Sequence, residues 1–293
     1  MRRGNSARPE LDTMAISAAD VRTLREKTGA PMMDCKKALD ASGGDFDAAE
    51  DHLRKMGLKS AGKKVGRSTG EGRCFQKINA EGTKGAMIAL ACETDFVAAT
   101  EDFEKFLGDL CDHILSNNPE NAEEIVGQKW AGGGTVQEAL TTLIGKLGEN
   151  MSIVGAKLVV ADGGFVGGYI HHNQKVGVLS AIKTEASRED TEAVLKQLGM
   201  HAAAVMPTAL SREEIDADLV EREVAIYREE VKGKPDDIQD KIIQGKLNKF
   251  YAGICLREQA WVMDDSKSVQ RAIEDAIGKG SIITDYGRFN IGE

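Results

Sequence analysis

The chain repeats one layout of secondary structure, and this repeat constrains its fold more than any other feature of the sequence. Residues 72–114 and 162–204 each present a strand, a polar turn, a second strand, a corner and an amphipathic helix. In the first copy, the apolar run 86–91 predicts a buried strand. We therefore expect an α+β fold whose core contains two related subdomains, each built from antiparallel strands and a helix.

The corner of the first copy, Cys92-Glu93-Thr94-Asp95-Phe96-Val97-Ala98-Ala99, places an aromatic ring between a strand and a helix. Either Thr94 or Asp95 is a suitable N-cap for the helix. The ring of Phe96 could fold back to close the corner, or it could face a partner. The aligned corner of the second copy has Ala186 at this position. A ring needed only to close the corner would be expected in both copies, so we predict that Phe96 contacts a partner.

Composition limits the class of protein. A chain of 293 residues exceeds one small core, so two or three domains are expected. The net charge of -9 argues against general binding to nucleic acid, and no apolar run approaches the length of a membrane span. The five cysteines are scattered and form no Cys-x-x-Cys pair. This pattern favours reduced thiols in a cytoplasmic protein over a disulfide framework or a zinc site.

Turn residues and changes in composition predict the domain boundaries. Residues 1–13 are expected to be a disordered tail, and 14–57 a small domain of three helices joined by Gly-rich turns. The second helix is expected at about 32–41 and the third at about 45–56. Residues 58–70 are rich in Gly, Lys, Arg and Ser and predict a basic linker or the frayed end of the third helix. Because no aromatic residue is interleaved, a solvated tether is favoured over an RNA contact. We expect the first core subdomain at 71–152 and the second at 153–293.

The loop Gly29-Ala30-Pro31-Met32-Met33 resembles the Met-containing loop of ubiquitin-associated-type domains. Adjacent side chains at the start of a helix cannot both point inward. We therefore expect at least one of Met32 and Met33 to be exposed, where a flexible thioether suits protein contacts. The alternative, with both methionines partly buried in a small core, stays open at this point.

Residues 211–254 carry two apolar stripes with heptad-like spacing on either side of Gly233-Lys234-Pro235. This pattern predicts an antiparallel helical hairpin at about 213–254, inserted into the second subdomain. An isolated helical hairpin buries only the apolar residues between its two helices, so we expect it to pack on another subunit or on the core.

Sequence motifs for catalysis are absent. The chain has no phosphate loop, dinucleotide fingerprint, Gly-x-Ser-x-Gly elbow or paired zinc motif. His171 and His172 are neighbours in a predicted strand, where they would point to opposite faces and make poor joint metal ligands. His201, on an Ala-rich helix, is expected to be structural. We therefore expect a binding protein, with no enzymatic activity, cofactor or metal.

Two long stretches carry a resemblance to a known family. Residues 24–39 read LREKTGAPMMDCKKAL and residues 92–98 read CETDFVA, and both resemble signature stretches of bacterial elongation factor Ts. Gly-Lys-Leu-Gly-Glu-Asn at 145–150, Tyr-Ile-His at 169–171 and the Gly-Lys-Pro turn follow in the family's order. The chain departs from the family at Pro31, where Gly is usual, and after the corner at Ala99. It also ends without the C-terminal helical module of some members, so contacts made through that module are not expected.

The resemblance implies a guanine-nucleotide exchange factor for the GTPase elongation factor Tu, located in the cytoplasm and performing no covalent catalysis. It implies that the corner wedges beside the nucleotide and disturbs the magnesium site, that the N-terminal helices seat on the same domain, and that His171 reaches another domain. The implied partner-binding residues are Met32, Met33, Thr94, Asp95, Phe96, Val97 and His171. No membrane or direct nucleic-acid contact is expected. A hairpin that pairs subunits would give a homodimer or a two-to-two complex.

A second hypothesis also follows from the sequence. A ubiquitin-associated-like module followed by a basic linker fits an adaptor in translation, linked to a chaperone or to RNA. Salt-sensitive RNA binding would support this hypothesis, which predicts no effect on nucleotide release. An enzyme is the third hypothesis, because the sequence shows no group of polar residues that would come together in a catalytic site.

Overall fold

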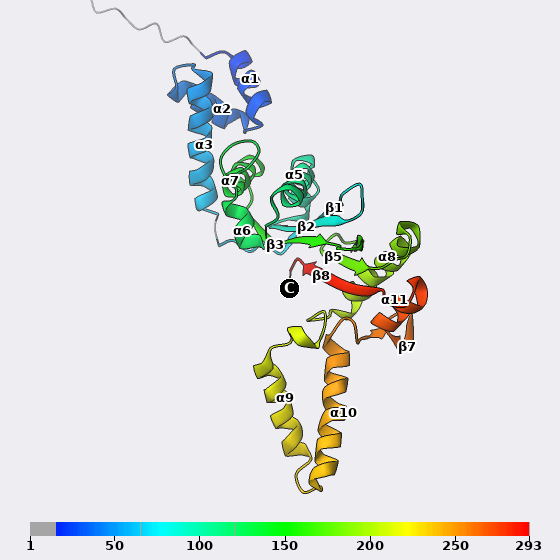
Figure 1. The fold of residues 1–293 in the computed structure, drawn as a ribbon. Helices are drawn as coiled ribbons and strands as arrows, with labels where there is room; N and C mark the ends of the chain where they lie inside the picture. The colour runs from blue at the N-terminus through cyan, green and yellow to red at the C-terminus, as the bar shows by residue number, and fades with distance from the viewer. Residues whose placement is uncertain (1–15, 65, 120, 293) are drawn as a thin grey trace, which may run out of the picture.

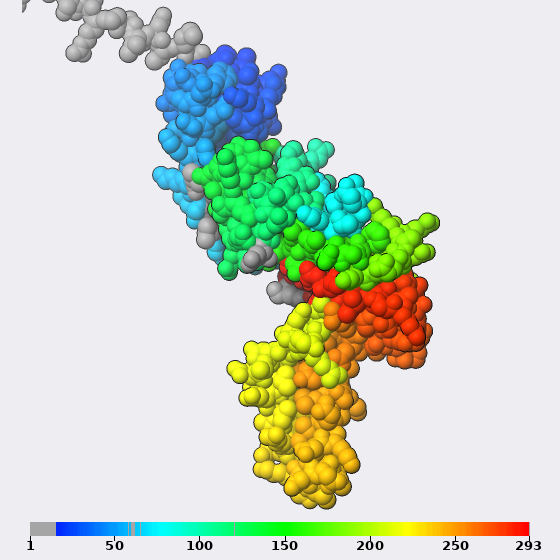
Figure 2. Space-filling model, viewed as in Figure 1, coloured from blue at the N-terminus to red at the C-terminus, as the bar shows by residue number. Residues whose placement is uncertain are grey.

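The computed structural model describes residues 16–64, 66–119 and 121–292. The expected tail of residues 1–13 lies outside these ranges. The described chain combines helices with antiparallel sheets, which confirms the α+β prediction (Figure 1). In the space-filling view, the N-terminal helices lie at one end of an elongated molecule and α9 and α10 at the other, with the sheets between them (Figure 2).

Helices α1 (Ala18–Thr28), α2 (Met32–Ala41) and α3 (Phe46–Gly62) pack around a small apolar cluster of their own. Helix α1 begins at a capping box formed by Ser17 and Asp20 and ends at Gly29, whose φ of 67° is readily adopted only by glycine. Helix α2 has the predicted bounds. These ends were predictable because each depends on residues within one turn.

Helix α3 is longer than the sequence predicted. We expected it to end at Met56, but it continues to Gly62, inside the expected linker. Its second half packs on α7 (Val136–Leu147), where a Cβ added to Gly145 would lie 3.2 Å from the Cα of Gly57. Packing against another helix supplies stability that a short isolated segment lacks. The extension is therefore a tertiary effect.

The first sheet has the order β1-β2-β3, all antiparallel, from β1 (Glu71–Ile78), β2 (Lys84–Cys92) and β3 (Met151–Val160). Helix α7 ends at Gly148, with φ 85°, and the chain returns along the free edge of β2 so that Met151 pairs with Cys92. The boundary expected at 152/153 therefore falls inside β3, a strand of the first sheet.

The second sheet has the order β4-β5-β8, from β4 (Gly164–Ile170), β5 (Val176–Lys183) and β8 (Ile282–Asn290). The two sheets pack face to face through residues that include Met87, Val159 and Leu179. A Cβ added to Gly155 of β3 would lie 2.5 Å from the ring of Phe289 in β8, which shows how closely the layers approach.

Helices cover the outer faces of both sheets (Figure 1). Helices α4 (Asp95–Ala98), α5 (Glu101–Asn117), α6 (Ala122–Gly127) and α7 belong to the first sheet. Helices α8 (Arg188–Val205) and α11 (Val269–Ile277) belong to the second. Side chains of β2 alternate accordingly: Ile88 and Leu90 face the helices, and Met87 faces the second sheet.

The two repeats contact each other in a reciprocal way. The N–H of Cys74 in β1 donates to the carbonyl of Gln174 in the β4–β5 turn, at 2.7 Å. The N–H of Val166 in β4 donates to the carbonyl of Gly82 in the β1–β2 turn, also at 2.7 Å. Each outer strand thus meets the turn of the other repeat, which locks the sheets in register.

Helices α9 (Ala217–Glu230) and α10 (Asp236–Ile254) follow a short 3-10 helix (Arg212–Glu214) and lie side by side (Figure 1). Lys246 of α10 pairs with Glu230 and lies 5.1 Å from the ring centroid of Tyr227. Beyond α10, residues 259–263 have the sequence pattern of a strand, but only β6 (Ala260–Trp261) forms there. It pairs with β7 (Asp264–Ser268), which the sequence analysis missed.

The contact between the sheets predicts a sensitive position. We expect Gly155→Ala to lower the free energy of unfolding by about 1–3 kcal/mol, because its new methyl group would overlap the Phe289 ring. Urea unfolding of the purified chain measures this. Gly253→Ala, at a helical glycine with open space around it, is the control and should not be destabilised. Equal stability of the two variants would contradict the close approach of the sheets.

Candidate functional site

The corner that follows β2 is built from two capped helices. Thr94 caps α4, its Oγ1 accepting from the N–H of Val97 at 3.3 Å, and Thr100 caps α5 by accepting from Phe103 at 3.3 Å. Of the two candidates, Thr94 is therefore the N-cap. Ala98 between the caps is buried in the first core, as is Phe103, so the corner is attached to the core on its helical side.

Phe96 points away from that core. Its side chain is 82% exposed, the largest value among the exposed large apolar residues that the structure describes, whereas Phe103 is fully buried. The alternative in which the ring folds back to close the corner is therefore wrong. In the second repeat, Ala186 at the equivalent position packs partly against the second core. The exposed ring is thus a feature of the first corner and not of the repeated layout.

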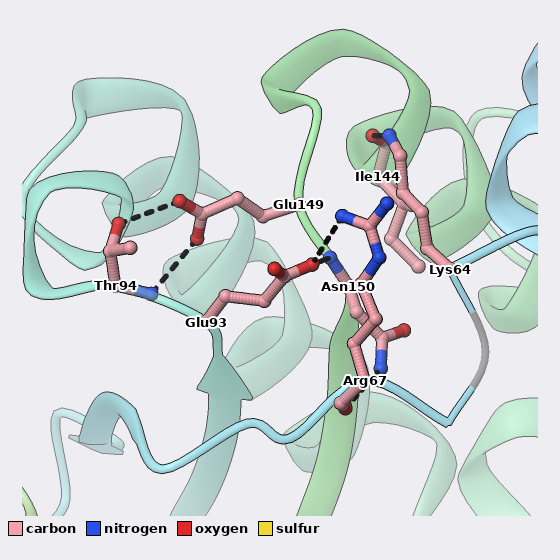
Figure 3. Close-up of polar contacts among 7 residues, drawn as sticks. All are labelled: Lys64, Arg67, Glu93, Thr94, Ile144, Glu149 and Asn150. Carbon is pink, nitrogen blue, oxygen red and sulfur yellow. Dashed lines mark hydrogen bonds and ion pairs between the residues drawn. The ribbon is translucent and has the colours of Figure 1, made fainter.

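Two carboxylates hold the base of the corner (Figure 3). Glu149 accepts two hydrogen bonds from Thr94, one from its N–H at 3.0 Å and one from its Oγ1 at 2.6 Å. Glu93 accepts from the N–H of Asn150 at 2.7 Å. The two residues that follow β2 are therefore bonded to the two residues that precede β3. This arrangement fixes the backbone just before Phe96 through charge-assisted hydrogen bonds.

Sequence reasoning did not identify Glu93, Glu149 or Asn150 as parts of the site. The stretch 145–150 was noted only as a motif. Because β3 pairs with β2, the residues just before β3 lie beside the corner. The sequence does not show this pairing, because it depends on which strand the chain joins after α7. A helix that ends at a glycine next to the buried strand is the feature that could have indicated it.

The electrostatics around the corner follow from these contacts. The hydrogen bond from Asn150 lowers the pKa of Glu93 below its usual value, and the nearby Arg67 and Lys64 lower it further. Beneath the corner, burial raises the pKa of Cys92 to about 11, and the charge of Glu149 adds to this. The Cys92 thiol donates to the carbonyl of Thr94 at 3.1 Å. It is therefore protonated at neutral pH and acts as a structural group.

The basic segment before β1 is attached to this site. Lys64 Nζ donates to the carbonyl of Ile144 at 3.3 Å, and Arg67 forms an ion pair with Glu93 at 3.3 Å (Figure 3). The amide of Asn150 donates to the carbonyl of Arg67 at 3.0 Å. The expectation of a solvated tether was wrong for these residues, because carboxylates and carbonyls of the core bind the cations.

Both methionines of α2 are exposed. Met32 retains 44% and Met33 61% of its surface, and neither packs against the apolar cluster of the N-terminal helices, so the alternative with both partly buried in that core is wrong. Pro31 precedes the helix and its φ of -56° suits a helix start, whereas Cys35, Ala38 and Leu39 form the buried face. The apolar pair lies at the helix N-terminus outside that face. Two flexible thioethers in this position form an apolar contact surface.

His171 lies in the turn after β4 and not in the strand. Because β4 ends at Ile170, the rings of His171 and His172 come within 4.2 Å of each other, centroid to centroid. The expectation that they point to opposite faces was wrong. The Nδ1 of His171 is hydrogen-bonded to the hydroxyl of Tyr169 at 2.8 Å.

The His171 turn and the Phe96 corner lie at the same end of the sheets. Lys175, in the same turn, pairs with Glu71 at 2.7 Å, and Glu71 is opposite Cys92 in the β1–β2 register. Strand β1 thus connects the two candidate contact sites.

The remaining chemistry-bearing residues have structural surroundings. The buried His201 accepts from the N–H of Val262 at 3.2 Å and is hydrogen-bonded to Gln259 at 3.1 Å, which confirms its structural role. All five cysteines are buried and unpaired, as the pattern of scattered thiols predicted. Within the described ranges no group of His, Cys, Asp or Glu could hold a metal ion, and no helix is long and apolar enough to span a membrane. Of the candidate contact residues, Met32, Met33, Asp95 and Phe96 are exposed, whereas Thr94, Val97 and His171 are half-buried.

Comparison with known proteins gives one family. A sequence model of the family described as Elongation factor TS matches residues 93–293. The Elongation factor Ts of Trichlorobacter lovleyi is 44% identical over 291 residues, covering 96% of this chain and 94% of its own. That of Clostridium botulinum is 41% identical over 283 residues, covering 95% and 93%. That of Cytophaga hutchinsonii is 40% identical over 278 residues, covering 94% and 99%.

The exposure of Phe96 predicts that its ring contributes little to folding. Phe96→Ala should change the free energy of unfolding by no more than about 0.5 kcal/mol, because the ring is already in solvent. Phe103→Ala, the matched change at a buried position of the adjoining helix, should cost about 3–5 kcal/mol. Urea unfolding monitored by circular dichroism distinguishes them. A comparable loss in both variants would show that Phe96 closes the corner after all.

Proposed function

The chain belongs to the elongation factor Ts family, and we propose that it is a guanine-nucleotide exchange factor for elongation factor Tu. It binds the GDP form of this GTPase, promotes release of GDP and leaves when GTP rebinds. Such a protein makes and breaks no covalent bond. The observation that carries the proposal is an aromatic ring held 82% exposed on a braced corner.

The corner supplies the wedge in this mechanism. Asp95 and Phe96 enter the GTPase domain beside the nucleotide, with Thr94 and Val97 at the base of the contact. Magnesium and phosphate contacts hold the nucleotide in GTPases, so a small displacement there accelerates its release. An apolar ring favours the open state if that state offers a pocket that the closed state lacks.

Thermodynamic linkage sets the direction of the effect. A factor that weakens the binding of GDP must itself be bound more weakly in the presence of GDP, by the same ratio. The wedge therefore needs to bind only the nucleotide-poor state strongly. A contact concentrated in one large side chain meets this requirement, because the side chain can be buried only in a state of the partner that has a pocket for it.

Two further contacts are part of the proposal. The N-terminal helices, in a ubiquitin-associated-like arrangement, seat on the same GTPase domain through Met32 and Met33, and their exposure of 44% and 61% supports this. His171 contacts another domain of the partner. Its turn lies at the same end of the sheets as Phe96, which supports engagement of one partner by both.

We also propose that α9 and α10 form a helical hairpin through which two copies of the chain associate, giving a homodimer or a two-to-two complex. Ile226 and Ile238 on these helices are 52% and 42% exposed, which supports a contact beyond the seam between them. Apolar residues on a projecting pair of helices are typical of an interaction surface.

Release of a fluorescent GDP analogue from elongation factor Tu tests the exchange activity. Substoichiometric amounts of the chain should accelerate release, and Phe96→Ala should lower the maximal rate by about tenfold or more while changing half-saturation less. Ile78→Ala, at another exposed apolar residue of the first repeat, is the control. No acceleration by the unaltered chain would reject the proposal. An unchanged rate for Phe96→Ala would reject the wedge.

Association through α9 and α10 predicts a change in oligomeric state. Ile226→Asp should convert a dimer into a monomer in sedimentation velocity, because a charge in the contact would lose its hydration. Val262→Asp, at a similarly exposed apolar residue outside α9 and α10, is the control. A monomeric unaltered chain, or a dimer unaffected by Ile226→Asp, would reject this contact.

A further inference from the structure

The segment 145–150 at the end of α7 touches both parts of the chain that we propose for partner binding. Its sequence is Gly-Lys-Leu-Gly-Glu-Asn. The local turn needs only Gly148, whose φ of 85° ends the helix. The residues on either side of Gly148 contact α3, the α1–α2 loop, α5 and the Phe96 corner. The need to end the helix does not explain these contacts.

The first contacts join the segment to the N-terminal helices. Gly145 and Gly57 bring α7 and α3 together at their backbones, since an added Cβ on Gly145 would lie 3.2 Å from the Gly57 Cα. Just beyond the end of α3, Lys64 Nζ donates to the carbonyl of Ile144, the residue before Gly145, at 3.3 Å. At the other end of α7, Arg54 pairs with Glu138 at 3.0 Å. Helix α3 is thus attached along α7.

Lys146 extends the connection to the loop that leads into α2. Its ammonium pairs with Asp102 of α5 at 2.7 Å. Its side chain also lies against Gly29, where an added Cβ would come within 2.5 Å of the lysine Cε. Gly29 stands three residues before Met32 in the chain. One lysine therefore lies between the methionine-bearing loop and the helix that follows the corner.

The last two residues of the segment hold the corner itself. Glu149 accepts both donors of Thr94, and the backbone N–H of Asn150 donates to Glu93 (Figure 3). Within six residues, the chain therefore passes from the N-terminal helices to the residue before Asp95. The segment is short, and residues at both of its ends contact neighbouring elements.

We propose that segment 145–150 holds the Phe96 corner in a fixed orientation relative to the Met32–Met33 end of α2, and that Glu149 is the positioning residue for the corner. The inference rests on the proposed exchange function. Glu149 does not touch the partner and acts through Thr94. A corner ordered before docking loses less conformational entropy on binding, and two anchors on one rigid body make the second contact intramolecular.

Glu149→Gln is the informative variant because it keeps the size of the side chain. A carboxylate accepts from both donors of Thr94, whereas the amide offers one oxygen and turns an NH2 group toward the other donor. The corner loses at least one hydrogen bond, but Phe96, Met32 and Met33 are unaltered. Glu189→Gln removes the same charge from an exposed position on α8 and serves as the matched control.

We expect Glu149→Gln to lower the saturating rate of GDP release from elongation factor Tu by about tenfold, with the half-saturating concentration changed less than about twofold. Thr94→Val removes the hydroxyl that donates to Glu149 and should lower the rate as well. Gly145→Leu should instead raise the half-saturating concentration, because it separates α3 from α7. Urea unfolding of each variant separates these effects from loss of the folded chain.

Hydrogen exchange of the free chain tests the positioning without the partner. The amides of Val97 and Ala98 are bonded to Thr94, so they should exchange faster in Glu149→Gln than in Glu189→Gln. If the unaltered chain does not accelerate GDP release, the proposed function fails while this measurement still decides whether Glu149 fixes the corner. Unchanged amide exchange, or an unchanged saturating rate with an active unaltered chain, would overturn the inference.

Discussion

Strand β2 is buried on both of its faces, and the position of the corner depends on this. Ile88 and Leu90 pack under the helices of the first layer, while Met87 contacts the second sheet. A slip of one residue would exchange these two sets of side chains, so the register of the strand is strongly specified. Its end at Cys92 is therefore fixed relative to both layers. The chain that leaves this end carries Phe96 on a rigid base, although the ring itself lies in solvent.

The base of the corner is polar and its tip is apolar, and each has a different physical reason. At the ends of β2 and β3, backbone N–H groups leave the ladder and need new acceptors, because an unpaired buried donor is costly. Glu149 and Glu93 supply those acceptors for Thr94 and Asn150. Stabilising the corner in this way requires no aromatic packing. Phe96 is thus left available for a contact outside the chain, and removing it should leave the fold intact.

Local features of the fold were predictable from the sequence, whereas features that depend on distant packing were not. The caps at Ser17 and Thr135 and the repeated strands and helix follow from residues within one or two turns. The exposure of Phe96 followed from comparing the two repeats. The extension of α3 to Gly62 and the ion pair of Arg67 depend on surfaces that the chain forms only when folded. The histidine pair was misplaced because β4 ends at Ile170, before both histidines.

A braced corner also suits the energetics of exchange. Negative coupling requires the factor to distinguish the nucleotide-poor state of its partner from the nucleotide-bound state. A flexible loop could place its ring on the surfaces of both states. Binding with equal affinity to both states would not change the equilibrium between them. In the proposed mechanism, a ring carried on a backbone that Glu149 fixes through Thr94 would meet its pocket only where the partner has opened, so its binding free energy would contribute to the difference between the states. Rigidity of the segment beneath Phe96 is therefore part of how the proposed wedge discriminates, and not only of how the corner folds.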